Sequence, residues 1–185
     1  MSLGILAVIG LAVGMMFTAA TQGTSAAVDS RQVSVQQKMI SMRLNTAVRA
    51  STKFLAAGDG YLVLWIADTN VNETPNLSEL RRIDYDTRSG RLTSYVAQFP
   101  ADWTAEQIAA ADTEYDLAAD FAAVTQGLKS GSLFVGSAWS SRVSGATFTL
   151  NRNSPQMADL VTYDVTLTGG TSSLDALGAA ALRAE

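Results

Sequence analysis

Two residue types that carry much of protein chemistry, cysteine and histidine, are missing from the 185 residues of this chain. Without cysteine, the fold has no disulfide bonds and no thiolate can bind a metal. Without histidine, the chain lacks the commonest general base and the commonest transition-metal ligand. The nucleophile elbow, the phosphate-binding loop and the zinc motifs are also absent from the sequence. We therefore expect that the protein is not an enzyme.

Acidic side chains could also support catalysis, because paired carboxylates can act as general acid and base. Asp84 and Asp86 stand two residues apart on a predicted strand, so they would share one face. Acidic residues on a strand face are usually solvated, and we expect that these two are. Basic residues are too few for nucleic-acid binding, since 13 Lys and Arg stand against 17 Asp and Glu and the isoelectric point is about 4.8. We expect no nucleic-acid partner.

Charged side chains are missing altogether from the first 28 residues, and residues 3–20 are almost entirely apolar. A helix rises about 1.5 Å per residue, so roughly 20 apolar residues span a hydrocarbon core about 30 Å thick. Gly10 and Gly14 form a GxxxG pair, a spacing that lets helices approach closely in lipid, although glycine is also common in membrane helices by chance. Residues 3–20 are therefore predicted to lie in a membrane or in a helical bundle.

Three interpretations of this apolar segment are open. A cleaved signal peptide would fit Ser25-Ala26-Ala27 as its cleavage site, but it needs a basic leader, and the first basic residue is Arg31. A transmembrane anchor fits the length, and the basic residues that follow it would keep the rest of the chain in the cytoplasm. In the third interpretation, the sequence begins inside a longer gene whose basic leader is missing.

The apolar segment runs into an amphipathic stretch, residues 26–57, that no proline or glycine interrupts. Apolar side chains recur there at steps of seven, four, four and seven residues and mark one helical face: Val33, Ile40, Leu44, Val48 and Leu55. Gly58 and Gly60 then end the pattern. One continuous helix over residues 1–57 would be roughly 80 Å long. The alternative is two helices broken near residues 22–24.

The remaining residues, 58–185, are predicted to form one small domain with its own core. Branched and aromatic runs indicate strands over residues 61–67, 80–86, 91–97, 133–136, 146–150 and 160–167. Gly90 suits the turn of a hairpin between the second and third of these strands. Thr104 and Gln107 form a capping box that opens a second helix, which continues to Leu128. The expected fold is α+β, with a long N-terminal helix packed on a small antiparallel sheet and one additional helix.

Between the first predicted strand and the hairpin lies a loop, residues 68–79, that is rich in oxygen-bearing side chains. The loop matches an EF-hand-type calcium loop at positions 1, 3, 5, 7 (a backbone carbonyl), 9 and 12: Asp68, Asn70, Asn72, Thr74, Asn76 and Glu79. Glu73 stands where such a loop has glycine, and Pro75 stands where it has an aliphatic residue. With only two charged ligands, the affinity for Ca²⁺ would be weak, in the millimolar class. The alternative is an Asx-rich turn without metal.

The long helix, the following sheet and the missing catalytic set resemble type IV pilin-like proteins, the group of minor pilins and pseudopilins. Residues 3–57 match the long first helix of this family. Residues 61–67 with the loop after them, residues 77–83 and the C-terminal stretch 178–183 are similar to members of the family. The basic leader, the Gly-Phe cleavage point and the glutamate just beyond it are not in this sequence, which fits the interpretation of a late start.

The resemblance implies a function in filament assembly without catalysis, in a type IV pilus or a type II secretion pseudopilus. The apolar half of the helix would hold the subunit in the bacterial inner membrane and later pack with other pilin or pseudopilin subunits, with Gly10 and Gly14 in that packing. The globular domain would lie outside the cytoplasm or on a cell-surface or periplasmic filament. The alternatives are a membrane-anchored, calcium-dependent binding module of the envelope that does not polymerise, and a secreted protein cleaved after Ala27.

Overall fold

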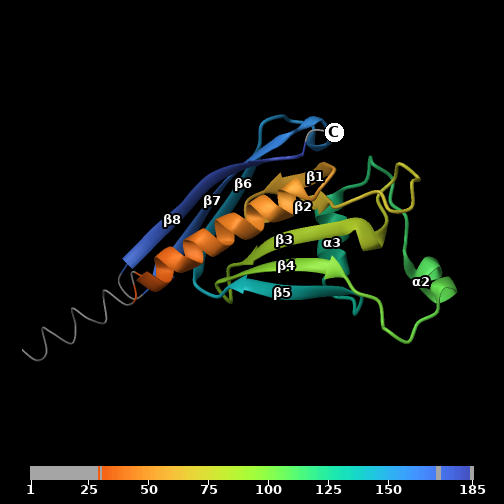
Figure 1. Ribbon diagram of the computed structural model, residues 1–185, viewed down its shortest axis with the longest axis horizontal. Coiled ribbons are helices and arrows are strands. Elements are labelled where there is room, and N and C mark those ends of the chain that lie inside the picture. The colour runs from red at the N-terminus through yellow and green to blue at the C-terminus, as the bar shows by residue number, and fades with distance from the viewer. Residues whose placement is uncertain (1–28, 30, 170–171, 184–185) are drawn as a thin grey trace, which may run out of the picture.

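The computed structural model describes residue 29, residues 31–169 and residues 172–183 (Figure 1). The fold of these residues is α+β, as predicted, with an N-terminal helix over residues 31–49, short helices and two antiparallel sheets. The predicted apolar segment 3–20, with Gly10 and Gly14, lies outside the described residues. Within the described part of the chain, no helix combines the length and the apolar character that a membrane crossing requires.

The two sheets are formed by consecutive parts of the chain, and within each sheet every strand pairs antiparallel with its neighbour in sequence. The larger sheet consists of β1 (Lys53–Gly58), β2 (Tyr61–Trp65), β3 (Leu80–Asp86), β4 (Arg91–Ala97) and β5 (Phe134–Ser140). The smaller sheet consists of β6 (Val143–Leu150), β7 (Leu160–Gly169) and β8 (Ser172–Ala181). Short 3-10 turns, η1 (Leu77–Glu79) and η2 (Pro155–Met157), precede β3 and β7. The Gly60 N–H donates to the carbonyl of Ala146 at 2.8 Å and so joins the two sheets.

The N-terminal helix contributes one wall of the main hydrophobic core. Its buried face, which includes Ile40, Leu44 and Val48, packs with inward-facing residues of both sheets, and Figure 1 shows the helix lying along them. The opposite face of the larger sheet has a core of its own, in which Phe121 of α3 (Phe121–Leu128) lies in the same cluster as Trp65. The larger sheet therefore has a packed core on each face, while most of its edge strand β5 is exposed.

The N-terminal helix ends earlier than the sequence pattern predicts. The expected end is residue 57, but the helix stops at residue 49, and Lys53–Gly58 form strand β1. The reason lies in Phe54 and Leu55, which are adjacent, both buried, and parts of two different cores. A strand places successive side chains on opposite faces, whereas a single helical face cannot serve two cores in this way. The boundary between the helix and the sheet domain therefore lies near residue 50.

The predicted single helix from Thr104 to Leu128 is wrong, because the chain forms α2 (Ala105–Ala111) and α3 with a non-helical segment between them. The capping box is confirmed: the Thr104 hydroxyl accepts a hydrogen bond from the Gln107 N–H at 3.3 Å, and Gln107 Oε1 accepts one from the Thr104 N–H at 2.8 Å. Backbone hydrogen bonds between residues 113–115 and residues 75–77 replace those that would continue the helix.

The strands that the sequence predicts most clearly are confirmed. The hairpin of β3 and β4 has the expected bounds, and Gly90 in its turn has a φ of 63°. In β7, Val161, Tyr163, Val165 and Leu167 are buried on one face, as their alternation indicates. The prediction of one small sheet is wrong, however. Strands β1 and β8 were not expected, and together with the others they give two sheets rather than one.

Candidate functional site

The predicted calcium loop is closed by hydrogen bonds from its own backbone. Both carboxylate oxygens of Asp68 accept backbone hydrogen bonds, from the N–H groups of Asn72 at 3.1 Å and Glu73 at 3.0 Å. The Asn72 amide donates to Asn76 Oδ1 at 3.0 Å. Glu73, which stands at the position of the usual glycine, has a φ of 61°, the left-handed conformation that glycine adopts most easily. The loop therefore makes the sharp turn without glycine.

Glu79, the predicted twelfth ligand, is a buried carboxylate that is 2% exposed. It accepts hydrogen bonds from the indole N–H of Trp65 at 3.0 Å, from the backbone N–H of Asn76 at 3.1 Å, and from the N–H and hydroxyl of Thr69 at 2.6 and 2.8 Å. Burial raises the pKa of Glu79, but the hydrogen bonds from Thr69, Asn76 and Trp65 together lower it by more than burial raises it. The pKa therefore lies below its usual value near 4.5. The charged carboxylate holds the two ends of the loop together.

The structure brings the predicted ligands into one loop, but it surrounds the two carboxylates with hydrogen-bond donors. The Asn70 N–H adds a further donor to Glu79. The Thr74 hydroxyl donates to Glu114, which is not one of the predicted ligands. The donors on Glu79 fill its lone pairs, so calcium would have to displace some of them, whereas each oxygen of Asp68 accepts one hydrogen bond and keeps a lone pair. In the described part of the chain, no group of three or more acidic residues is arranged to hold a metal ion. Calcium binding here stays a prediction.

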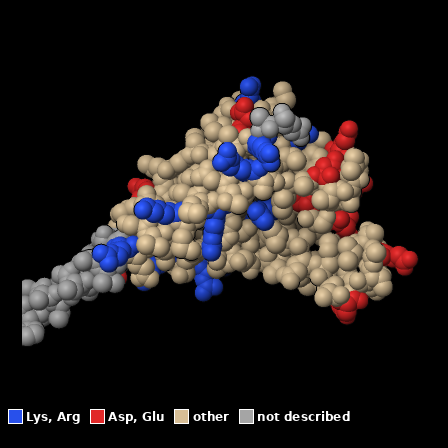
Figure 2. Space-filling model, viewed as in Figure 1, with Lys and Arg blue, Asp and Glu red and all other residues tan. Residues whose placement is uncertain are grey.

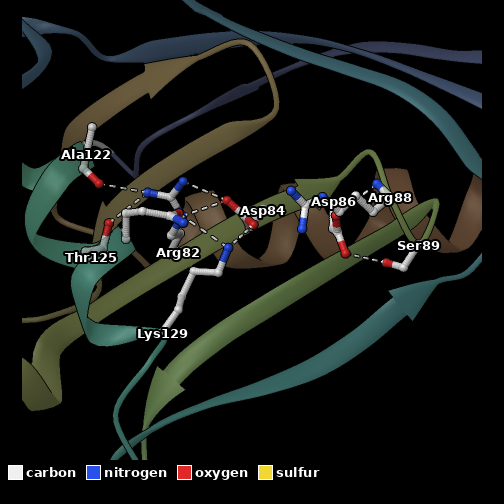
Figure 3. A network of polar contacts seen from close by, with 9 residues as sticks. Arg82, Asp84, Asp86, Arg88, Ser89, Ala122, Thr125 and Lys129 are labelled. Carbon is white, nitrogen blue, oxygen red and sulfur yellow. Dashed lines mark hydrogen bonds and ion pairs between the residues drawn. The ribbon is translucent and has the colours of Figure 1, made fainter.

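A second polar cluster joins β3 to α3 (Figure 3). The guanidinium of Arg82 donates to Asp84 at 2.7 Å, to the carbonyl of Ala122 at 3.1 Å and to the hydroxyl of Thr125 at 3.0 Å. Lys129 donates to the other carboxylate oxygen of Asp84. The expectation that Asp84 is solvated is therefore wrong, because a strand face that meets α3 is not open to water. Sequence reasoning missed this cluster, although Arg82 and Asp84 lie two residues apart on one strand face.

Every charged group of this cluster contacts another protein group. The guanidinium of Arg82 lies 4.9 Å from the ring centre of Tyr61, and the ammonium of Lys129 lies 5.2 Å from that of Tyr95. Arg82, Asp84 and Lys129 also line an open depression of about 270 Å³. Asp86 is exposed, as predicted, and accepts hydrogen bonds from Ser89 and Arg88 in the hairpin turn rather than joining Asp84. We assign the cluster the structural role of fixing α3 to the sheet.

The face of the N-terminal helix that points away from the core exposes large apolar side chains. Val35, Met39 and Met42 are 52%, 44% and 70% exposed, and their spacing of four and three residues places them on one stripe. We call these three residues the outer stripe. It lies opposite the buried face, and the exposed basic residues Arg31 and Lys38 belong to the same helix. Apolar patches next to charged residues are typical of surfaces that bind a partner.

Comparison of the chain with protein-family models, with curated proteins and with solved structures finds no match. A functional interpretation therefore depends on the residues and contacts of the chain itself. Of the surfaces described, the outer stripe is the one whose groups have no counterpart within the described fold, because hydrogen bonds hold the carboxylates of the polar loop and the Asp84 cluster pairs its own charges.

Proposed function

We propose that the chain is a non-catalytic subunit of a filament of the type IV pilus or type II secretion pseudopilus class, assembled through its N-terminal helix. The support from the sequence is the uncharged apolar segment 3–20, which leads without proline into the helix of residues 31–49. The support from the fold is an amphipathic helix packed along antiparallel sheets. Filament subunits of this class would sit in the inner membrane before assembly.

The observation that carries the proposal is the outer stripe of the helix. A surface helix that serves only its own domain needs one apolar face, and the face with Leu44 already meets that need. A second apolar face on the opposite side costs solubility unless another molecule covers it. A helix of a second copy is a fitting cover, because helices pack together by interdigitating such rows of side chains. The same helix can then bind its own sheets and a neighbouring subunit at once.

The test compares two exposed methionines that differ only in position. Met42 in the outer stripe is 70% exposed, and Met157 in η2 is 69% exposed, so Met157→Lys is a matched control for Met42→Lys. The full-length chain is produced in bacterial membranes and cross-linked, and the oligomer ladder is measured. We expect Met42→Lys to reduce the oligomers about tenfold, because a charge would enter an apolar contact. Equal ladders for the two variants, or a wild-type chain without oligomers, would contradict the proposal.

A membrane-anchored module that binds partners through calcium is the second candidate, and the oxygen-rich loop 68–79 is the observation in its favour. This candidate differs from the first in two measurable ways. It gives no oligomers in the cross-linking experiment, and it gives heat in a calorimetric titration with millimolar calcium. Asp68→Ala is the control variant for that titration, since it removes one of the two charged ligands.

A further inference from the structure

Charge is distributed unevenly along the chain and over the surface. Residues 31–53 carry five basic side chains and no acidic one, whereas residues 92–128 carry six acidic side chains and no basic one. Figure 2 shows the consequence: Lys and Arg gather over the middle of the molecule and toward the N-terminal helix, and Asp and Glu gather at the end that carries α2 in Figure 1. Charges of opposite sign therefore predominate on different parts of the surface, although the net charge is only −4.

The basic side includes a cleft of about 650 Å³, which lies where the N-terminal helix ends and β1 begins. Three basic residues, Arg49, Lys53 and Arg183, line this cleft together with Ser51 and Ile66, and none of the described residues that line it is acidic. Arg49 and Arg183 are exposed and form no ion pair with any described residue. Lys53 forms no ion pair with a described residue either, although its ammonium lies 5.2 Å from the ring centre of Trp65, and three such cations at one cleft favour an anionic partner. We call these three residues the basic cleft.

The opposite end of the molecule supplies such a surface. Asp102, Glu106, Glu114 and Asp116 are all exposed and come from α2 and the segments on either side of it. We call these four residues the acidic end. No Lys or Arg within the described ranges forms an ion pair with any of them. Two complementary and uncompensated surfaces on one chain can each be satisfied by the other surface of a second copy.

We propose that the basic cleft of one copy binds the acidic end of the next copy. The contact joins two different surfaces, so it is heterologous, and repeated heterologous contacts that do not close into a ring produce an open helical filament. The inference rests on the proposed function and adds to it: the helices associate along their outer stripes, while the charged surfaces fix the orientation and the spacing of the globular domains. High salt weakens the contact, because exposed charges are screened.

Charge reversal with reciprocal rescue tests the contact in the full-length chain, with cross-linked oligomers as the readout. The cleft variant is Arg49→Glu with Arg183→Glu, and the end variant is Glu106→Lys with Glu114→Lys. Each alone places like charges together, and we expect about a tenfold loss of oligomers. Mixed in equal amounts, the two variants present opposite charges at every contact between unlike copies, so the oligomers return. Arg88→Glu with Arg152→Glu, which changes the same charge at two exposed residues elsewhere, leaves them unchanged.

The outcomes separate this inference from the proposed function. A wild-type chain that forms no oligomers overturns both. Oligomers that form but respond equally to the cleft variant and to its control overturn the charged contact alone. A loss in the cleft variant that the end variant does not rescue also overturns it, because the cleft then binds an anion other than the acidic end, such as a lipid headgroup. Thermal unfolding of each variant accompanies the experiment, so that loss of assembly is not confused with loss of fold.

Discussion

The side of the larger sheet that meets α3 and the outer face of the N-terminal helix carry similar residue types, yet they use them differently. On the α3 side, Arg82 and Lys129 both bind Asp84, and the nearby apolar side chains are buried. On the helix, Met39 and Met42 face solvent, and Arg49 forms no ion pair with any described residue. The first region is saturated by contacts within the chain. The second keeps groups without a partner among the described residues, and under the proposed function these are the residues that serve assembly.

The largest loss of stability is expected for Asp84→Ala, on the face of the larger sheet that meets α3. The change leaves two cations, Arg82 and Lys129, without their carboxylate in a site where Asp84 is 7% exposed. Removing one partner of a buried ion pair costs about 3–5 kcal/mol of unfolding free energy. Urea unfolding measures it, and Asp86→Ala, at the exposed neighbour on the same strand, is the control, from which we expect a clearly smaller loss because only hydrogen bonds of the exposed hairpin turn are removed. Similar losses for both variants would mean that the network contributes nothing.

Leu44→Ala is expected to come next, because it empties part of the core between the helix and the sheets. Leu44 has no exposed surface, and such a truncation costs about 2–5 kcal/mol depending on how far the core collapses. Val35→Ala on the opposite face of the same helix should change the unfolding free energy by only about 0.5 kcal/mol. Denaturant unfolding of both variants measures the contrast. If Val35→Ala cost as much as Leu44→Ala, the outer face would be part of the fold.

The pH dependence of stability tests the other buried carboxylate. The pKa of Glu79 is lowered in the fold, so its contribution is fully present above the unfolded value near 4.5 and is lost as the pH falls through the lower folded pKa. Glu79→Gln cannot titrate. The difference in urea midpoint between wild type and Glu79→Gln should therefore shrink as the pH falls from about 6 to about 3. A difference that stays constant over this range would show that the charge of Glu79 does not stabilise the loop.

The smallest effect on folding is expected for Met42→Lys, the variant that should disrupt assembly most directly. Met42 is 70% exposed, so lysine fits there without loss of packing, and the unfolding free energy should change by about 0.5 kcal/mol or less. Thermal unfolding of the same preparation used for cross-linking provides the measurement. A marked loss of stability would mean that Met42 belongs to the saturated region, and the cross-linking result would then report on folding.

The parts of the fold that could be predicted from the sequence are those where one local pattern decides. The helical periodicity of apolar residues predicts the buried face of the N-terminal helix, and the alternation of apolar and polar residues predicts β7. Gly90, which can adopt a positive φ, predicts the turn of the β3–β4 hairpin. Strand β1 could not be predicted, because its residues continue a helical apolar pattern and only tertiary pairing with β2 makes them a strand. The break before α3 likewise depends on hydrogen bonds to a distant loop.

The candidate sites, too, could be predicted from the sequence only in part. The oxygen-rich loop 68–79 could be located from the sequence, but which donors occupy its carboxylates depends on Trp65 and on the backbone path. Lys129 joins Asp84 from far along the chain, and no local spacing points to it. The outer stripe was within reach, since Val35, Met39 and Met42 have helical spacing. The sequence analysis did not identify it, because the apolar face that includes Leu44 already accounts for an amphipathic helix.

The position of the N-terminal helix also determines where the chain can be cut. Because residues 31–49 form a wall of the core shared by both sheets, a proteolytic cleavage within them would open the core and release fragments that cannot keep their fold. Cleavage before residue 29 would leave every described core contact in place. The globular domain is therefore inseparable from its helix.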